Sequence, residues 1–258
     1  MKKFLTALCI SFMAITYSNA EILSVGVSGN IGLLTADGKE SVSGTSERQV
    51  VWKDTFADTK TAGTRDTKTS EGEEKMAMGY VSLFSEFHLG DTGLRLGVNY
   101  VPYALESEAT DNKRNDNCSQ PQQHLTTGSN VCSETNNKVQ VDLEDMYSLY
   151  VAYHFNVEHT VLDSVFVKAG VIDAQVITKE LLNTGSSYGN SSLTGEFVGF
   201  GIEKSISNGF FIRGEGNVTR YDDIRLTNGV AAGHENTNTI NITNLDGATA
   251  VISVGRSF

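Results

Sequence analysis

Apolar and polar residues alternate with a period of two in eight segments of this chain, without the spacing of an amphipathic helix. The pattern is clearest at the carboxyl terminus, where Ala248, Ile252 and Val254 share a face with the final Phe258. Such alternation predicts strands that have one apolar face. The eight predicted strands are Leu23–Leu33, Met76–Leu89, Leu94–Val101, Val141–Phe155, Val165–Ile172, Leu193–Lys204, Phe210–Tyr221 and Asp246–Phe258.

The connections between these strands alternate between long and short. Polar stretches rich in Ser, Thr, Asn and charged residues occupy Leu34–Lys75, Pro102–Gln140, Asp173–Ser192 and Asp222–Thr239, whereas the other three connections are short turns. A membrane-spanning meander requires this alternation, with long loops outside the cell and short turns in the periplasm. We therefore predict an all-β, antiparallel, up-and-down transmembrane barrel of eight strands, or of ten if the first polar stretch holds a complete hairpin.

The strand faces opposite the apolar ones carry charges, which a barrel would point into its interior. Eight strands leave an interior just wide enough for side chains, so buried charges of both signs favour a structural plug of ion pairs. The alternative is a small pore, which abundant glycine on the inner faces would favour. The predicted interior charges are Glu86, Arg95, Glu144, Lys168, Arg213 and Glu215.

Residues 1–20 have the features of a secretory signal peptide. Lys2 and Lys3 precede an apolar stretch, and Ser18-Asn19-Ala20 offers small residues for cleavage. A transmembrane anchor is the alternative, but the apolar run is short and interrupted by polar residues. We expect residues 21–258 to form the mature barrel domain.

Composition supports an exported membrane barrel. The formal net charge is −11, and loss of two lysines with the signal makes the mature chain more acidic, which argues against nucleic acid as a partner. Only 39% of residues are hydrophobic, a lean supply for a soluble sandwich but enough for a barrel that is apolar on its outer face.

Two cysteines remain after the signal, Cys118 and Cys132, and both lie in one polar stretch. In an exported protein they are most simply a disulfide. The alternative is a metal site, but His124 is the only nearby histidine. We predict a disulfide, no metal and no cofactor.

With these features the chain resembles the small outer-membrane barrels, namely the OmpA membrane domain, OmpX and the opacity-protein family. The resemblance rests on the signal, the alternation of loops and turns, and the closing Val251–Phe258. It implies that Ile252, Val254 and Phe258 form the signal read by the barrel-assembly machinery. Arg256 departs from the family pattern, because this position is usually apolar; we expect its side chain to reach the periplasmic interface.

The resemblance implies a structural or surface-interaction role in the outer membrane. Expected partners are membrane lipid, lipopolysaccharide and an extracellular ligand bound by the loops; acidic loop residues could contact lipopolysaccharide through divalent cations. Lipid-modifying enzymes of similar architecture carry a His with Ser, Asp or Glu near the outer leaflet. Here His88, His154 and His159 are predicted near the periplasmic end. Outer loops hold His124 and His234 without a recognisable nucleophile pattern around them, so we expect no catalysis.

Overall fold

The computed structural model describes residues 22–49, 60–64, 68–107, 110–118, 132–157, 161–181, 188–228 and 236–258. The predicted signal peptide and its cleavage site lie outside these ranges, as do His124, His159 and His234. No helix within the described ranges is long and apolar enough to cross a membrane.

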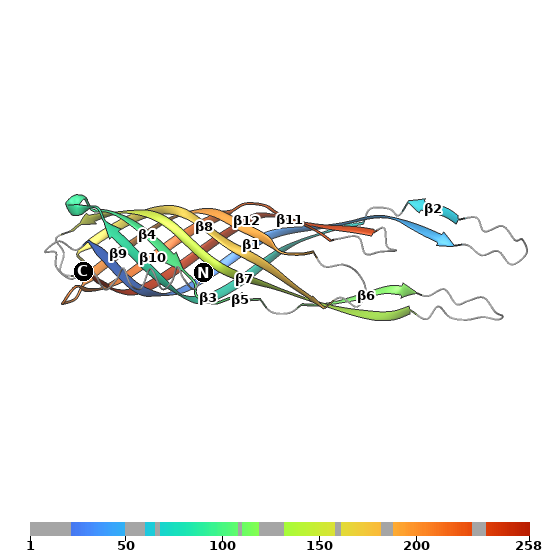
Figure 1. The fold of residues 1–258 in the computed structure, drawn as a ribbon, viewed down its shortest axis with the longest axis horizontal. Coiled ribbons are helices and arrows are strands. Elements are labelled where there is room, and N and C mark those ends of the chain that lie inside the picture. Colours follow the sequence, from blue (N-terminus) through green and yellow to red (C-terminus); the bar gives the residue numbers. More distant parts are fainter. Residues whose placement is uncertain are drawn as a thin grey trace, which may run out of the picture.

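Eight antiparallel strands form a closed ring, which confirms the predicted fold (Figure 1). The last ring strand pairs with the first over the register from Ser24–Ser257 to Gly44–Asn236, and this pairing closes the barrel. The ring strands are β1 (Leu23–Gln49), β3 (Lys68–His88), β4 (Leu94–Tyr100), β7 (Cys132–Asn156), β8 (Ser164–Leu181), β9 (Ser191–Ser205), β10 (Phe210–Tyr221) and β12 (Asn236–Ser257).

Four short strands lie outside the ring. They pair with β1, β7 and β12 and add no strand to the ring, so the alternative of ten ring strands is wrong for the described residues. A 3₁₀ turn, Gly90–Thr92, connects β3 and β4. The short strands are β2 (Lys60–Thr64), β5 (Leu105–Glu106), β6 (Thr110–Cys118) and β11 (Ile224–Thr227).

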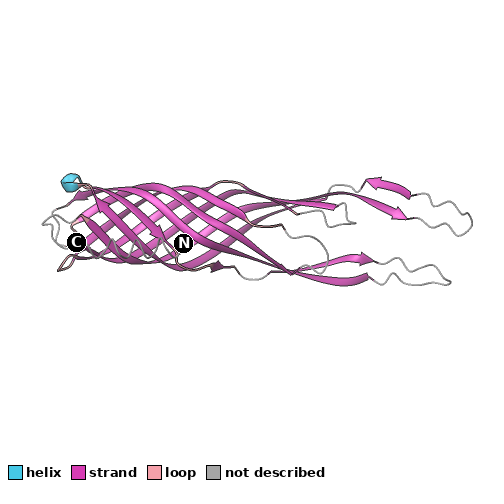
Figure 2. Ribbon diagram, in the orientation of Figure 1, coloured by secondary structure: helices cyan, strands magenta, loops and turns pink. Residues whose placement is uncertain are grey.

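The polar stretches were predicted as loops, but much of them continues the strands. β1 runs to Gln49, and β7 already begins at Cys132. Figure 2 shows these extensions as strand pairs beyond one end of the barrel. Antiparallel backbone pairing does not itself require an apolar face, so strands outside a membrane can lack the alternation that marks membrane strands.

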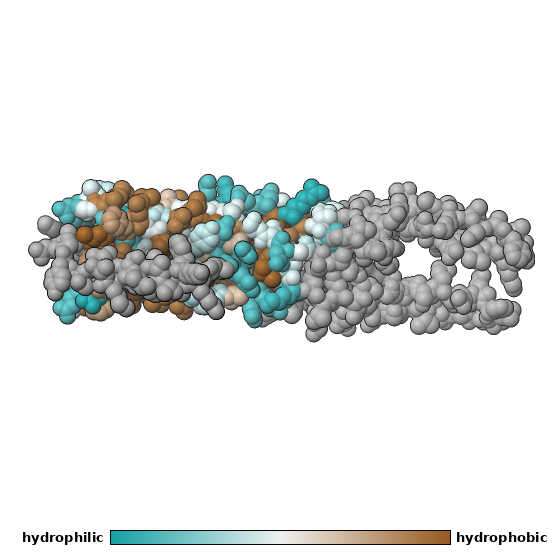
Figure 3. All heavy atoms as spheres, in the orientation of Figure 1, coloured by the Kyte–Doolittle hydropathy of each residue, from teal (hydrophilic) through white to brown (hydrophobic). Residues whose placement is uncertain are grey.

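The outer wall of the ring is apolar. Outward residues such as Ile31, Phe200 and Ile252 are 69, 71 and 70% exposed, and Figure 3 shows apolar residues gathered over the barrel end of the molecule. On β7 the apolar outward residues run from Tyr147 to Phe155, the length of a strand that crosses a bilayer. Glu196, which interrupts the pattern of β9, ends the apolar wall.

The two ends of the barrel domain are fastened together by backbone hydrogen bonds. The Phe258 carbonyl accepts from the Ile22 N–H at 2.7 Å, and the Phe258 N–H donates to Leu23 at 2.8 Å. The Arg256 guanidinium lies 4.7 Å from the Phe258 ring and 5.3 Å from the Phe210 ring. Its charge thus contacts aromatic faces at the end of the wall opposite the strand extensions.

Two bulges reverse which face points inward. β7 has an extra residue between Glu144 and Tyr147, with Asp145 at φ 51°, and β12 has a similar irregularity with Asn244 at φ 51°. Beyond the first bulge Leu143 packs inside the barrel, so Glu144 lies on the other face. The prediction that Glu144 points inward is therefore wrong.

Candidate functional site

The interior of the membrane-spanning region holds a cluster of four charges, which we call the ionic cluster: Glu86, Arg95, Glu203 and Arg213. Arg213 donates to both oxygens of Glu86, at 2.7 and 2.8 Å, and to Glu203 at 2.7 Å. Arg95 donates to both oxygens of Glu203, at 3.1 and 3.2 Å. Two cations and two anions are thus joined by charge-assisted hydrogen bonds, and the Arg213–Glu86 and Arg95–Glu203 pairs are bidentate.

Aromatic rings surround the ionic cluster. The Arg213 guanidinium lies 5.3, 5.0 and 5.2 Å from the centres of Phe84, Phe166 and Phe211. The Arg213 side chain is only 3% exposed and that of Glu86 only 1%. The charges are therefore removed from water, so they depend on one another for compensation.

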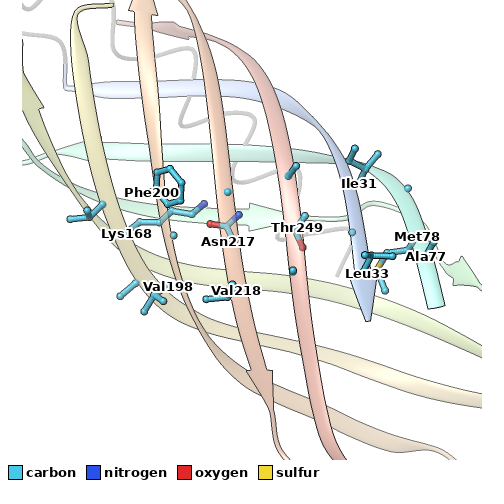
Figure 4. Close-up of a pocket in the computed structure, with 18 of the residues that line it drawn as sticks. Ile31, Leu33, Ala77, Met78, Lys168, Val198, Phe200, Asn217, Val218 and Thr249 are labelled. Atoms are coloured by element: carbon cyan, nitrogen blue, oxygen red, sulfur yellow. The ribbon is translucent and has the colours of Figure 1, made fainter. Parts of the chain in front are cut away.

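A second ion pair joins Lys168 of β8 to Glu215 of β10. The Lys168 Nζ lies 4.6 Å from the Tyr150 ring centre, and Asn217 donates to Glu215 at 2.6 Å. Figure 4 shows Lys168 and Asn217 extending toward each other from neighbouring parts of the wall. The Tyr150 hydroxyl donates to Glu86 at 2.9 Å. Tyr150 therefore contacts the second pair through its ring and the ionic cluster through its hydroxyl.

Interior glycines make room for the aromatic rings. A Cβ on Gly97 would lie 2.2 Å from the Tyr150 ring, and one on Gly255 would lie 2.3 Å from the Phe211 ring. Small residues thus face large ones across neighbouring strands, as is common in the interiors of small barrels. The space that glycine could have given a pore is occupied by aromatic side chains.

Beyond the second pair, toward the strand extensions, apolar residues fill the interior. We call them the apolar cap. β11 contributes two of them, and the two bulges turn residues from β7 and β12 inward to pack against them. The buried members are Val101, Met146, Ala174, Val176, Leu193, Ile224, Leu226 and Leu245.

A cavity of about 50 Å³ separates the second ion pair from the apolar cap. Its lining includes Asn99, Glu215 and Asn217, and the side-chain oxygens of both asparagines have no hydrogen-bond partner in the described part of the chain. The volume suits an ordered water molecule or two, which would satisfy these acceptors.

Two serine–histidine contacts lie near the end of the barrel opposite the strand extensions. Ser24 Oγ is 2.7 Å from His88 Nε2, and Ser164 Oγ is 3.2 Å from His154 Nδ1. Ser24 is 0% exposed and Ser164 is 4% exposed. A nucleophile must reach its substrate, so these buried hydroxyls have the geometry of structural contacts.

The structure brings together five of the six predicted interior charges, in two groups. Glu86, Arg95 and Arg213 lie in the ionic cluster, and Lys168 pairs with Glu215. Glu203 was not among the predicted interior charges, although its side chain points inward. The preceding residue of β9, Ile202, faces outward. Extending the period of two to the end of β9 would have predicted an inward Glu203.

The predicted disulfide falls at the far end of the β6–β7 pair. The register places Cys118 directly opposite Cys132, an arrangement compatible with a cross-strand bridge. Their side chains are outside the described part of the structure, so the bridge stays a prediction. The predicted assembly residues Ile252, Val254 and Phe258 all face outward, 70, 53 and 41% exposed.

No family model matches the chain, and no curated protein was found to be similar. Similar solved structures include the attachment invasion locus protein Ail of Yersinia pestis, in complex with the heparin analogue sucrose octasulfate. The two chains share 9% identity at a TM-score of 0.35, over 89% of this chain and 99% of Ail.

Neisserial surface protein A shares 10% identity at a TM-score of 0.31, over 88% of this chain and 97% of its own. The outer membrane protease OmpT from Escherichia coli shares 8% identity at a TM-score of 0.35, over 95% of this chain and 99% of its own. At such low scores, function has to be inferred from the residues of this chain itself.

Proposed function

We propose that this protein is a closed, non-conducting barrel of the bacterial outer membrane, with a structural or surface-interaction role carried by its strand extensions. The observation that carries this proposal is the filled interior. The ionic cluster, the Lys168–Glu215 pair and the apolar cap follow one another along the barrel. Each of them would have to move before an ion could pass.

The surface role is supported by the length of the strands. β1 has 27 residues and β7 has 25, whereas crossing a bilayer takes about 9–11. The remainder continues the strands beyond the apolar wall of the barrel. A rigid scaffold with polar outer segments is suited to presenting an extracellular binding surface, and a disulfide between Cys118 and Cys132 would hold one of its arms together.

A small porin is the alternative function, and the packed interior argues against it. An enzymatic role is a weaker alternative because the serine–histidine contacts are buried. We propose that no catalysis takes place in this barrel and that assembly depends on the outward face of β12.

Planar-bilayer conductance of the refolded mature chain tests the proposal. We expect no steady channels from the wild type. Steady, ion-selective channels from the wild type that change in an Arg95→Ala, Arg213→Ala variant would make the protein a small porin. A silent wild type that binds to host or bacterial surfaces, and loses this binding when the strand extensions are shortened, is the expected result.

A further inference from the structure

The wall of the barrel has an open strand edge on β3. On one side β1 accompanies β3 as far as Lys68, whereas on the other side β4 leaves it at Leu83. β4 has 7 residues, fewer than the roughly 9–11 with which a strand crosses a bilayer. The next strand along the chain, β5, pairs with β7, which β6 then covers farther out. From Leu83 toward the strand extensions, β3 therefore has a partner strand on one side only.

A hydrogen bond from Val81 shows which backbone groups of β3 face this open edge. The Val81 N–H donates at 2.5 Å to the hydroxyl of Tyr103, which lies in the connection between β4 and β5. Because the N–H and C=O groups of alternate residues in a strand point to the same side, every second residue beyond Val81 also faces the edge. On that side the described part of the chain offers them no backbone partner. These residues are Gly79, Ala77, Lys75, Glu73 and Glu71.

Two of these residues belong to the apolar wall. Gly79 and Ala77 lie next to Ile31 and Leu33 of β1, which are 69 and 61% exposed. Backbone groups at this level meet lipid rather than water, so leaving them unpaired is costly. The Tyr103 hydroxyl satisfies one such group, and the described residues supply nothing equivalent for the next two.

Farther out the open edge is charged. The side chains of Glu71, Glu73 and Lys75 are 66, 59 and 70% exposed. Their ion pairs, Glu71 with Lys39 at 2.7 Å and Glu73 with Lys75 at 3.1 Å, are exposed and therefore weak. Neither a proline nor a bulge interrupts β3, although both commonly protect strand edges. An incoming strand thus meets a regular edge that is apolar at one end and mainly acidic at the other.

We propose that β3 from Gly79 to Glu71 is a docking site for an extended segment of another protein, which adds one strand antiparallel to β3. Opposite Gly79 and Ala77 the segment has apolar residues, which lie in lipid. Opposite Glu73 and Glu71 it has basic residues. This inference rests on the surface role proposed above and gives it a class of partner, whereas the closed interior is tested separately by conductance.

Amide hydrogen exchange of the full mature chain in phosphatidylcholine nanodiscs, followed by NMR, tests whether the edge is open. The amides of Ala77 and Lys75 should exchange about tenfold faster than those of Met76 and Glu74, which point toward β1 and pair with it. Equal protection of the two sets would mean that the edge already has a partner, and the proposal would be overturned.

A designed peptide then tests docking. The probe is N-acetylated, C-amidated Val-Thr-Val-Thr-Glu-Thr-Lys-Thr-Lys, whose alternate residues fall opposite Gly79 through Glu71 in antiparallel register. We expect it to slow exchange of the Ala77 and Lys75 amides about tenfold, and a scrambled peptide of the same composition to leave them unchanged. Absence of any protection by the designed peptide would also overturn the proposal.

Two sets of variants separate edge pairing from other modes of binding. Ala77→Pro removes an N–H that the β1 ladder does not use and should abolish protection by the peptide, whereas Ala77→Val keeps the N–H and should preserve it. Glu71→Lys, Glu73→Lys should reject the peptide and bind its counterpart with both lysines replaced by glutamate. Circular dichroism verifies folding, and the charge reversal remains decisive if the proline variant does not fold. Protection that survives in Ala77→Pro, or a peptide preference unchanged by the charge reversal, would contradict docking at this edge.

Discussion

At the residue scale, the ionic cluster makes each charge depend on its partners. Among the described residues, Arg213→Met leaves Glu86 and Glu203 with Arg95 as their one ion-pair partner, and we expect it to lower the free energy of unfolding by about 3–5 kcal/mol. Adding Glu86→Gln restores the balance, because the bidentate Arg95–Glu203 pair remains. Urea unfolding in detergent micelles should therefore find the double variant more stable than Arg213→Met; the reverse order would contradict a compensated cluster.

Asp163, in the turn between β7 and β8, contributes to the stability of the folded protein in a way that depends on pH. The Lys204 ammonium, 2.7 Å away, and the Ser205 N–H lower the pKa of Asp163. Because the folded-state pKa is lower than the unfolded one, the stabilisation is complete above about pH 3.9 and is lost as the pH falls through the lowered value. We expect Asp163→Asn and Lys204→Met each to be less stable than the wild type at neutral pH, with the difference vanishing in acid.

At the scale of elements, the bulge in β7 decides which residues form the apolar cap. Asp145 has a left-handed backbone, which asparagine and glycine also adopt at little cost. Asp145→Val should lower the free energy of unfolding by about 1–2 kcal/mol, whereas Asp145→Asn should change it by less than about 0.5 kcal/mol. Equal unfolding free energies for the two variants would show that the left-handed conformation is not required.

The bulges also mark the limit of what alternation predicts. From Tyr147 to Phe155 the period of two assigns each side chain of β7 to the correct face. It fails at Glu144, because the extra residue shifts the parity. A signal was present: Leu143 and Met146 are three residues apart, as are Ile242 and Leu245 on β12, and all four pack in or against the apolar cap.

Strand number and closure followed from local pattern, because membrane strands must keep one face apolar. The strand extensions and the pairing partners of the interior charges could not be predicted from that pattern. Extensions in water lack a required pattern, and pairings such as that of Arg95 with Glu203 join residues more than a hundred positions apart. Such contacts depend on the shear of the whole barrel rather than on any one strand.

At the scale of the whole molecule, the ionic cluster and the apolar cap close the barrel in series. Opening either one alone leaves the other in place, so we expect neither Ile224→Ser, Leu226→Ser nor Arg213→Met, Glu86→Gln to conduct steadily in planar bilayers. In the variant with all four substitutions the Arg95–Glu203 and Lys168–Glu215 pairs still cross the interior, so we expect it to stay silent as well. Circular dichroism of each variant controls for folding. Steady conductance from the cap variant alone would mean that the charged interior passes ions, and the barrel would then be closed by its cap only.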